Sequence, residues 1–311
     1  LIDELNEGMM VGLPFDNIPM LTAETAGCLN GNFALVAGTS GSGKSTFVRN
    51  SILSSVVKHN ERLVVFINEE DEKKWKSEML IWVGNNIFNF DIQKHQLRNG
   101  KFSKELREKL DKCCEWLSSK NKQIMIIPFK TFSTSTCIKL IRKYMSLGVS
   151  KFIIDTFKLD TNSDMNLSWQ ILAQNAVRLY DCIKKTNRSE GAFLMATVQL
   201  GKSSSNQRHL SQDNIGVSKS IIDVASLGLL LRNVDISEKK GGSKELKVFK
   251  LAGKNSNSKI PVELDSNKHY TIIFIAKNRF GTAEDYQIVI EHDMSRNIIK
   301  EIGITYIEKS F

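Results

Sequence analysis

The octapeptide GTSGSGKS at residues 38–45 constrains the fold of this chain more than any other feature. It fits the pattern G-x-x-x-x-G-K-[ST], follows an apolar run and precedes a run with helical periodicity. The glycines let the backbone curl so that its N–H groups face an anion, which the positive end of the following helix also favours. We therefore predict a phosphate-binding loop between a strand and a helix. The alternative is an ordinary glycine-rich turn. Such a turn needs neither this spacing nor the flanking strand and helix patterns nor the terminal Lys-Ser pair, so their combination argues against it.

The predicted nucleotide-binding residues are those of the loop and the residue after it: Gly38, Thr39, Ser40, Gly41, Ser42, Gly43, Lys44, Ser45 and Thr46. We expect the Lys44 ammonium to reach the β- and γ-phosphates of ATP and so to act in catalysis. Mg²⁺ needs hard oxygen ligands and is normally coordinated by both protein and phosphate oxygens, so the Ser45 hydroxyl is a predicted metal ligand. ATP and Mg²⁺ are the predicted cofactors.

Short apolar runs alternate with longer helical patterns along the chain. This alternation predicts an α/β fold with a mostly parallel central sheet flanked by helices. Strands are predicted over residues 33–37, 63–67, 123–128, 151–155, 192–198 and 227–231. Three closely spaced later runs predict antiparallel strands near the C-terminus, at residues 245–251, 270–276 and 286–291. Helices are predicted where apolar residues recur at three- and four-residue spacing, over residues 44–59, 103–119, 135–147 and 167–186.

The domain organisation follows from these segments. We predict an N-terminal linker segment over residues 1–15, one ATPase domain over residues 16–295 and a C-terminal tail over residues 296–311. Two stretches rich in Ser, Asn, Gly and Lys, residues 201–218 and 234–243, are predicted to be loops.

Two further predicted strands end in carboxylates. Asp155 closes one of them, where a carboxylate can hold the water shell of Mg²⁺, although an Asp at a strand end is also a common turn former. Glu69 and Glu70 follow the other, and the C-terminal ends of parallel strands meet at one crevice. Adjacent residues of an extended chain point to opposite sides, so at most one of these glutamates faces the γ-phosphate and orients the attacking water. A solvated helix start describes part of this acidic run equally well.

Three other sets of residues have side chains that suit contacts with phosphates. Gln199 closes a strand, and its amide can donate and accept hydrogen bonds beside the γ-phosphate. Lys277 and Arg279 stand two apart on an extended segment, share one face and can reach the γ-phosphate of a neighbouring subunit. The predicted DNA-binding cations lie in or next to the polar stretch behind Gln199: Lys202, Arg208 and Lys219. A solvated loop is an equally weighted interpretation of that stretch.

Composition narrows the class of protein. Lys and Arg number 43 against 34 Asp and Glu, and the resulting net charge of +9 suits a partner that carries phosphates. The five cysteines lack metal-ligand spacing, so we interpret them as free thiols in a reducing compartment. Without a membrane-length apolar run or a signal peptide, we expect no membrane partner and a cytoplasmic location, or the host cytoplasm for a phage protein. Since residue 1 is Leu, we expect an upstream segment to be missing.

Taken in order, these segments resemble the ATPase domain of the DnaB-like replicative helicases, a hexameric branch of the RecA-like superfamily, over roughly residues 10–295. The strand before Glu69 looks like the family's strand ending in the catalytic glutamate, which assigns that role to Glu69 rather than Glu70. The strand ending at Asp155 resembles the Walker B strand. Residues 196–200 resemble the family's strand ending in Ser-Gln-Leu, with Val198 where Ser is usual.

The string AKNRFG at residues 276–281 is similar to the family's late motif. In that motif Arg279 is the arginine finger and Lys277 accompanies it in trans. The segment 213–223 departs from the family pattern, because Ile215 stands where Arg is usual and Ile221 and Ile222 stand where Glu-Gln is usual. These departures are more typical of a phage or mobile-element version than of a chromosomal one.

The resemblance implies a RecA-like P-loop ATPase that forms a homo-oligomer, a hexameric ring, around single-stranded DNA. Such a ring translocates and unwinds duplex DNA during replication, and a primase or helicase loader is an expected partner. KNRFG also resembles the RadA branch of recombination and repair translocases, but that branch's four-cysteine zinc motif and protease-like domain do not occur in this sequence. A recombinase filament and a non-motor ATPase that serves as a scaffold or loader are the other hypotheses.

Overall fold

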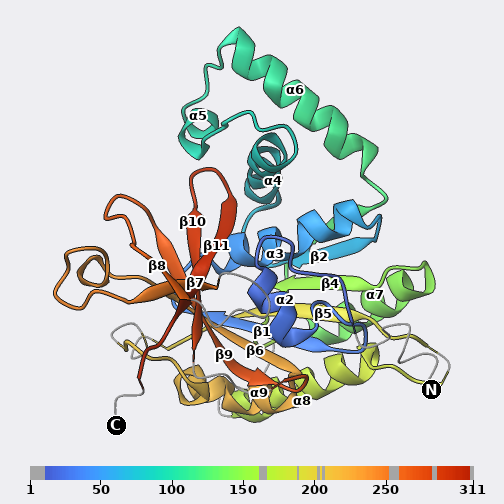
Figure 1. Ribbon diagram of the computed structural model, residues 1–311. Coiled ribbons are helices and arrows are strands. Elements are labelled where there is room, and N and C mark those ends of the chain that lie inside the picture. The colour runs from blue at the N-terminus through green and yellow to red at the C-terminus, as the bar shows by residue number, and fades with distance from the viewer. Residues whose placement is uncertain are drawn as a thin grey trace.

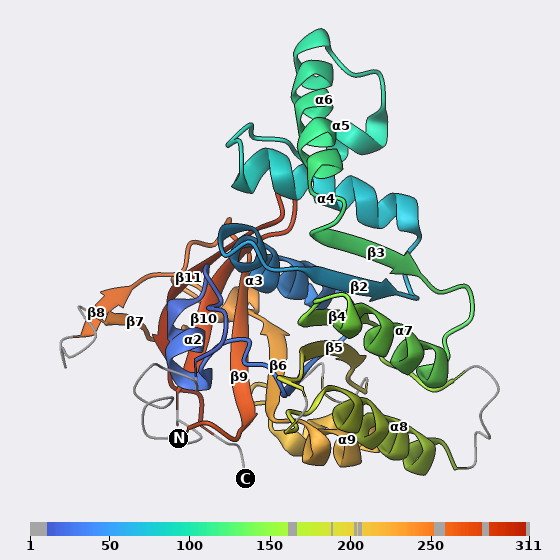
Figure 2. The same ribbon diagram turned by 90° about the vertical axis from the view of Figure 1, so that its right-hand side faces the viewer.

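The computed structural model describes residues 11–160, 167–187, 189–201, 204, 207–251, 259–281 and 286–308. Within these residues, one sheet of eleven strands runs through the molecule in the order β3-β2-β4-β5-β1-β6-β9-β10-β11-β7-β8 (Figures 1 and 2). The first six strands of that order are parallel and the others antiparallel. The predicted α/β class and the antiparallel strands near the C-terminus are confirmed.

The parallel half consists of β3 (Ile124–Pro128), β2 (Leu63–Ile67), β4 (Lys151–Asp155), β5 (Phe193–Gln199), β1 (Phe33–Gly38) and β6 (Leu227–Asn233). Its inner strands are buried along almost their whole length, which explains why they read as continuous apolar runs rather than as alternating patterns. All six lie where the sequence predicts them, to within two residues at either end.

Helices cover both faces of this half of the sheet (Figure 2). One face carries α3 (Lys44–Lys58), α4 (Glu72–Asn86) and the short α2 (Pro19–Thr25). On the same side, α5 (Lys94–Asn99) and α6 (Lys104–Ser119) pack against α4, farther from the sheet. The other face carries α7 (Thr134–Ser146), α8 (Ser168–Ile183) and α9 (Lys219–Val224). Successive residues of one strand point to opposite faces, so Val65 of β2 joins the first core and Phe66 the second.

The antiparallel half begins where β9 (Tyr270–Asn278) pairs with β6. It continues through β10 (Gln287–Asp293), β11 (Ile298–Thr305), β7 (Val248–Leu251) and β8 (Lys259–Val262). The short 3₁₀ helices η3 (Gln212–Ser218) and η4 (Ile236–Glu238) lie within the two stretches predicted to be loops.

The described parts of the two segments predicted to flank the ATPase domain pack into its sheet and core. In the predicted C-terminal tail, β11 pairs with both β10 and β7, so the described part of that segment belongs to the sheet. In the predicted N-terminal linker, residues 1–10 lie outside the described residues, whereas Leu13 bridges to Cys28 and Phe15 is fully buried. No helix in the described parts of the chain is long and apolar enough to cross a membrane.

Candidate active site

The phosphate loop leaves β1 at Gly38 and enters α3 at Lys44. Gly41 and Gly43 have positive φ angles of 77° and 81°, a conformation that favours glycine. The N-terminus of α3 has no side-chain cap, so the N–H groups of its first turn stay available to an anion. Ser42 is buried, its Oγ has no partner among the described residues, and its backbone N–H donates to Thr39 O at 3.2 Å. The loop therefore fits the phosphates of a nucleotide.

Lys44 bends back over the loop that precedes it. Its Nζ donates to the backbone oxygens of Gly38 at 3.0 Å and Thr39 at 2.9 Å. Burial lowers the pKa of Lys44, while the nearby carboxylates of Glu69 and Asp155 act in the opposite direction. The ammonium thus lies between the loop and the two carboxylates, and phosphate oxygens can replace the two carbonyls as its acceptors.

Asp155 and Glu69 come from neighbouring strands whose C-terminal ends meet, since Ile67 of β2 pairs with Asp155 of β4. Asp155 is 3% exposed and its Oδ1 accepts a hydrogen bond from Thr197 Oγ1 at 2.8 Å. The Glu69 Oε2 accepts one from Thr156 Oγ1 at 2.6 Å. The carboxylate and hydroxyl oxygens near the loop are the hard ligands that Mg²⁺ requires, so Asp155 and Ser45 fit this metal.

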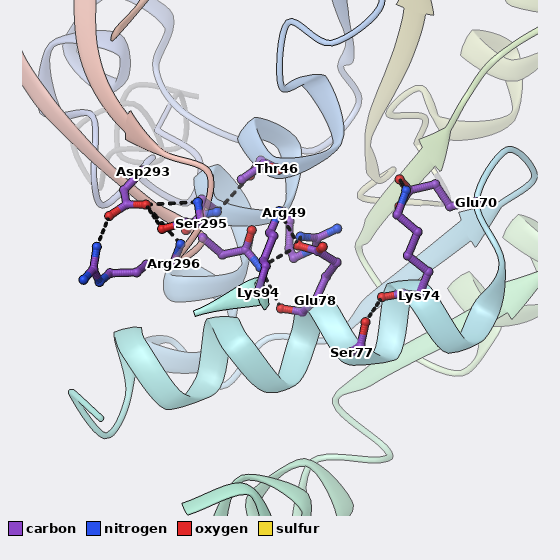
Figure 3. A network of polar contacts seen from close by, with 12 residues as sticks. Thr46, Arg49, Glu70, Lys74, Ser77, Glu78, Lys94, Asp293, Ser295 and Arg296 are labelled. Atoms are coloured by element: carbon purple, nitrogen blue, oxygen red, sulfur yellow. Dashed lines mark hydrogen bonds and ion pairs between the residues drawn. The ribbon is translucent and has the colours of Figure 1, made fainter. Parts of the chain in front are cut away.

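Glu70 has a different environment from its neighbour Glu69. Its Oε1 accepts from Lys74 Nζ at 2.6 Å, an i,i+4 pair at the start of α4 (Figure 3). The two adjacent glutamates therefore have separate partners, and Glu69 is the one beside Lys44. This geometry favours Glu69 over Glu70 for the water-orienting role, which stays a prediction.

Gln199 is placed beside the loop by strand pairing. It pairs with Gly38 across β5 and β1, and the next residue, Leu200, donates its N–H to Gly38 O at 3.0 Å. The Gln199 side chain is exposed at this edge of the sheet. Gln199 therefore adjoins the expected position of the phosphates, as its proposed role requires.

Lys277 and Arg279 lie toward the opposite end of the strands from the chain's own loop. In the strand register, Gly38 is level with Leu231 of β6, whereas Asn278 of β9 is level with Leu227. These four residues of β6 correspond to about 13 Å along the strand. Within one subunit, these two cations are therefore separated from the phosphate loop.

Both cations contact the C-terminal end of α9. Lys277 Nζ donates to Ile222 O at 2.7 Å and to Asp223 O at 2.6 Å, and Arg279 Nη2 donates to Asp223 O at 3.1 Å. The Arg279 guanidinium carbon also lies 5.9 Å from the centre of the Tyr180 ring. These contacts keep the two cations together on one edge of the molecule.

The predicted DNA-binding residues are not brought together within the described residues. Lys202 lies outside them, and so does the side chain of Lys219, whose backbone begins α9. Arg208 donates from Nε to Glu238 Oε1 at 3.1 Å and from Nη2 to Lys244 O at 3.0 Å. The Arg208 guanidinium thus has intramolecular partners, although its side chain is 47% exposed.

The segment that departs from the family pattern is part of the core. Ile215 is 2% exposed, and Ile221 and Ile222 are fully buried. All three belong to the apolar cluster that includes α7 and α8. Their apolar character therefore serves packing at this position.

A buried ion pair that the sequence did not reveal fixes the loop's helix to its neighbours (Figure 3). Arg49 of α3 is 1% exposed, contacts Glu78 of α4 at 3.3 Å and stacks 4.6 Å from the Trp75 ring centre. Lys94 Nζ and Asn297 Nδ2 also donate to Glu78 Oε2, each at 2.8 Å. This cluster joins α3, α4, α5 and the turn after β10.

The contact between His292 of β10 and the phosphate loop is a second feature that the sequence did not reveal. A Cβ added to Gly43 would collide with His292 Cε1, so the ring packs directly against the loop. Thr271 Oγ1 lies 3.2 Å from His292 Nδ1 and 3.4 Å from Asn233 Oδ1, and Asn233 Nδ2 donates to Gly41 O at 3.4 Å. The antiparallel half of the sheet thus supports the loop directly at Gly43 through His292, and at Gly41 through the contact of Thr271 with Asn233 of β6.

Comparisons with known proteins agree with this fold. The family model described as the DnaB-like helicase C terminal domain matches residues 15–297. A solved structure whose title describes it as an ATPase domain is 15% identical with a TM-score of 0.72, covering 97% of this chain and 95% of that chain. "The Structure Of A DnaB-Like Replicative Helicase And Its Interactions With Primase" is 16% identical with a TM-score of 0.70, covering 96% of this chain and 64% of that one. No curated protein matches. At these identities the solved structures show a shared fold.

Proposed function

Because the chain belongs to the DnaB-like helicase C-terminal domain family, we propose that it hydrolyses ATP in sites shared between neighbouring subunits of a ring. The observation that carries the shared site is the separation of Lys277 and Arg279 from the chain's own phosphate loop. Two cations at the far end of the strands cannot serve that loop, but in a head-to-tail ring the surface that carries them faces the loop of the next subunit.

Within one subunit, the described residues suit separate steps. The N–H groups of residues 38–45 and the Lys44 ammonium bind the phosphates. Ser45 and Asp155 offer oxygens to Mg²⁺, which when bound neutralises phosphate charge. Glu69 orients the attacking water, and Gln199 hydrogen-bonds beside the γ-phosphate.

The neighbouring subunit completes the site with Arg279 as the finger and Lys277 beside it. An arginine finger contributes about 10³ to 10⁵ in rate where it has been measured. In this structure both side chains donate to carbonyls at the end of α9. Reaching a neighbour's nucleotide requires exchanging those acceptors for phosphate oxygens, which are stronger acceptors for a cation.

We further propose that the hydrolysis cycle moves a hexameric ring along single-stranded DNA and unwinds duplex DNA, in the cytoplasm where replication takes place. The net charge of +9 and the cations Lys202, Arg208 and Lys219 support binding to DNA phosphates. A primase or helicase loader is the proposed protein partner; one similar solved structure has a title that names primase.

A forked-duplex assay tests the motor function. We expect the protein with ATP and Mg²⁺ to separate the strands and single-stranded DNA to raise its ATPase rate. Arg279→Ala should lower both activities by about 10³ or more. Arg107→Ala is a matched control, because Arg107 is an exposed arginine paired with Asp111 on α6. If the wild-type protein unwinds no forked duplex and Arg279→Ala keeps the wild-type ATPase rate, the proposal is refuted.

A further inference from the structure

Two threonine hydroxyls bridge the carboxylates of Asp155 and Glu69. Thr197 Oγ1 lies 2.8 Å from Asp155 Oδ1, and Thr156 Oγ1 lies 2.6 Å from Glu69 Oε2. The two hydroxyl oxygens are 3.1 Å apart. Thr197 is fully buried and Thr156 is 7% exposed, so the described structure gives the bridge little access to water. The four groups form a continuous path across the ends of β2, β4 and β5.

The backbone of Thr156 is fixed on its other side by Asn68. Asn68 Nδ2 donates to Thr156 O at 2.6 Å, and Thr156 N donates to Asn68 Oδ1 at 3.3 Å. Asn68 immediately precedes Glu69 and in turn donates its own N–H to Asp155 O. The hydroxyl of Thr156 therefore has a defined position relative to both carboxylates.

Each threonine hydroxyl has more than one acceptor within the bridge, but only one proton to donate. Each hydroxyl carries one proton, and the ionised carboxylates only accept. Thr197 Oγ1 can donate to Asp155 Oδ1 or to Thr156 Oγ1. Thr156 Oγ1 can donate to Glu69 Oε2 at 2.6 Å or to Asp155 Oδ1 at 3.5 Å. When Thr197 donates to Asp155, Thr156 can also donate to Thr197 Oγ1. When Thr156 donates to Glu69, the Glu69 carboxylate is held beside Asp155. When Thr156 donates to Asp155 or Thr197 instead, the Glu69 carboxylate loses that hydrogen bond and is free to turn.

We propose that Thr156 and Thr197 are positioning residues that set the orientation of the Glu69 carboxylate relative to Asp155 during hydrolysis. The proposal rests on the proposed function, because it takes Glu69 as the group that orients water and Asp155 as the group that holds Mg²⁺. Neither threonine is needed to bind the phosphates, since both act through the carboxylates. Their loss should therefore affect the chemical step and not nucleotide affinity.

The test compares Thr156→Val, which removes the hydroxyl at nearly constant volume, with Thr156→Ser, which restores it. We expect Thr156→Val to lower kcat roughly tenfold or more. A positioned general base contributes a rate enhancement of about 10² to 10⁴, and the variant should lose part of it. KM and the affinity for a fluorescent non-hydrolysable ATP analogue should stay within about twofold, and Thr156→Ser should recover most of kcat.

Thr305→Val is the matched structural control. Thr305 is 1% exposed, and its hydroxyl donates to Lys247 O at 3.0 Å on the distant β11. This variant loses a comparable hydrogen bond, so it should share any loss of thermal stability but keep the wild-type kcat. If Thr156→Val and Thr305→Val lower kcat equally, a general effect on folding explains both and the positioning role is refuted.

Glu69→Gln separates failure of this inference from failure of the proposed function. If Glu69→Gln abolishes hydrolysis while Thr156→Val keeps the wild-type kcat, the positioning role is wrong and the assignment of Glu69 stands. If Glu69→Gln itself keeps the wild-type kcat, the role of Glu69 is wrong and the inference fails with it. The double variant Thr156→Val/Glu69→Gln should be no slower than Glu69→Gln, because Thr156 acts through Glu69.

Discussion

His292 places a neutral imidazole against the phosphate loop. Burial, with smaller contributions from His269 and Lys94, lowers the pKa of His292 to about 3, while Asp293 acts in the opposite direction. In the unfolded chain this histidine binds a proton near its ordinary pKa of about 6.5. Because the folded-state pKa is depressed, its contribution to stability is complete above pH 6.5 and is lost as the pH falls toward 3.

We therefore predict that His292→Gln flattens the dependence of stability on pH. Between pH 6.5 and 3, His292 should lower the wild type's free energy of unfolding by up to about 1.4 kcal/mol for each unit by which the pH falls, because only the unfolded chain takes up the proton. Urea unfolding at a series of pH values measures this slope. His95→Gln, at an exposed position of α5, is the control and should keep the wild-type slope. Equal slopes in all three proteins would contradict the prediction.

Glu69 and Glu70 provide a comparison between adjacent residues of the same type. We predict that Glu69→Gln binds nucleotide normally but lowers kcat by roughly 10² to 10⁴, because the amide cannot accept a proton from water. Glu70→Gln removes only the exposed pair with Lys74 and should keep kcat within about twofold. Steady-state ATPase rates with parallel nucleotide-binding measurements test both. A larger loss in Glu70→Gln would move the role to Glu70.

At the scale of elements, α3 and α4 are joined by the buried contact between Arg49 and Glu78. The loop begins α3, and Glu69 lies three residues before α4, so this joint also connects the two parts of the site. Lys94 and Asn297 donate to the same carboxylate and extend the joint to α5 and to the turn after β10. One buried carboxylate therefore contributes, beside the sheet, to the relative position of the loop and Glu69.

We predict that Glu78→Ala lowers the free energy of unfolding by about 3 to 5 kcal/mol, because it leaves the Arg49 charge buried without its carboxylate. Glu72→Ala breaks the exposed pair with Lys76 on the same helix and should cost less than about 1 kcal/mol. Chemical denaturation of both variants gives the comparison. Similar losses in both would mean that the buried pair contributes no more than a surface pair.

The sequence predicts the parallel strands well because both of their faces are buried and their apolar runs are continuous. For α4 it indicated only a solvated helix start, although the spacing of Trp75, Met79 and Trp82 matches one face of a helix and all three are buried. It missed β11, because that strand is defined by its pairing with β10 and β7. Local periodicity does not contain such long-range pairing.

The same limit applies to the site. The loop pattern marks Lys44 and Ser45 directly, since all of its determinants are adjacent in sequence. The choice of Glu69 over Glu70 needed a family resemblance, whereas the structure separates them through the partner of each. Thr156, Thr197 and His292 gave no local signal, because their contacts depend on strands far apart in the sequence.

At the scale of the whole molecule, β9 joins the two surfaces that the proposed ring brings together. Thr271, near its first residue, contacts the side chain of His292 beside the chain's own phosphate loop. Lys277, near its other end, lies at the edge proposed to face the next subunit. In the proposed ring, each subunit presents half of one site and half of another, so a closed ring has as many complete sites as subunits.

The central claim is that each site takes residues from two subunits, and mixing two inactive variants tests it most directly. Glu69→Gln keeps the cations of Lys277 and Arg279, whereas Arg279→Ala keeps an intact loop, Asp155 and Glu69. In mixed rings at equal amounts, roughly a quarter of the interfaces combine an intact loop with an intact finger. The account predicts that the ATPase rate of the mixture clearly exceeds that of either variant alone. A mixture no faster than the average of the two variants would show that each subunit carries its own complete site.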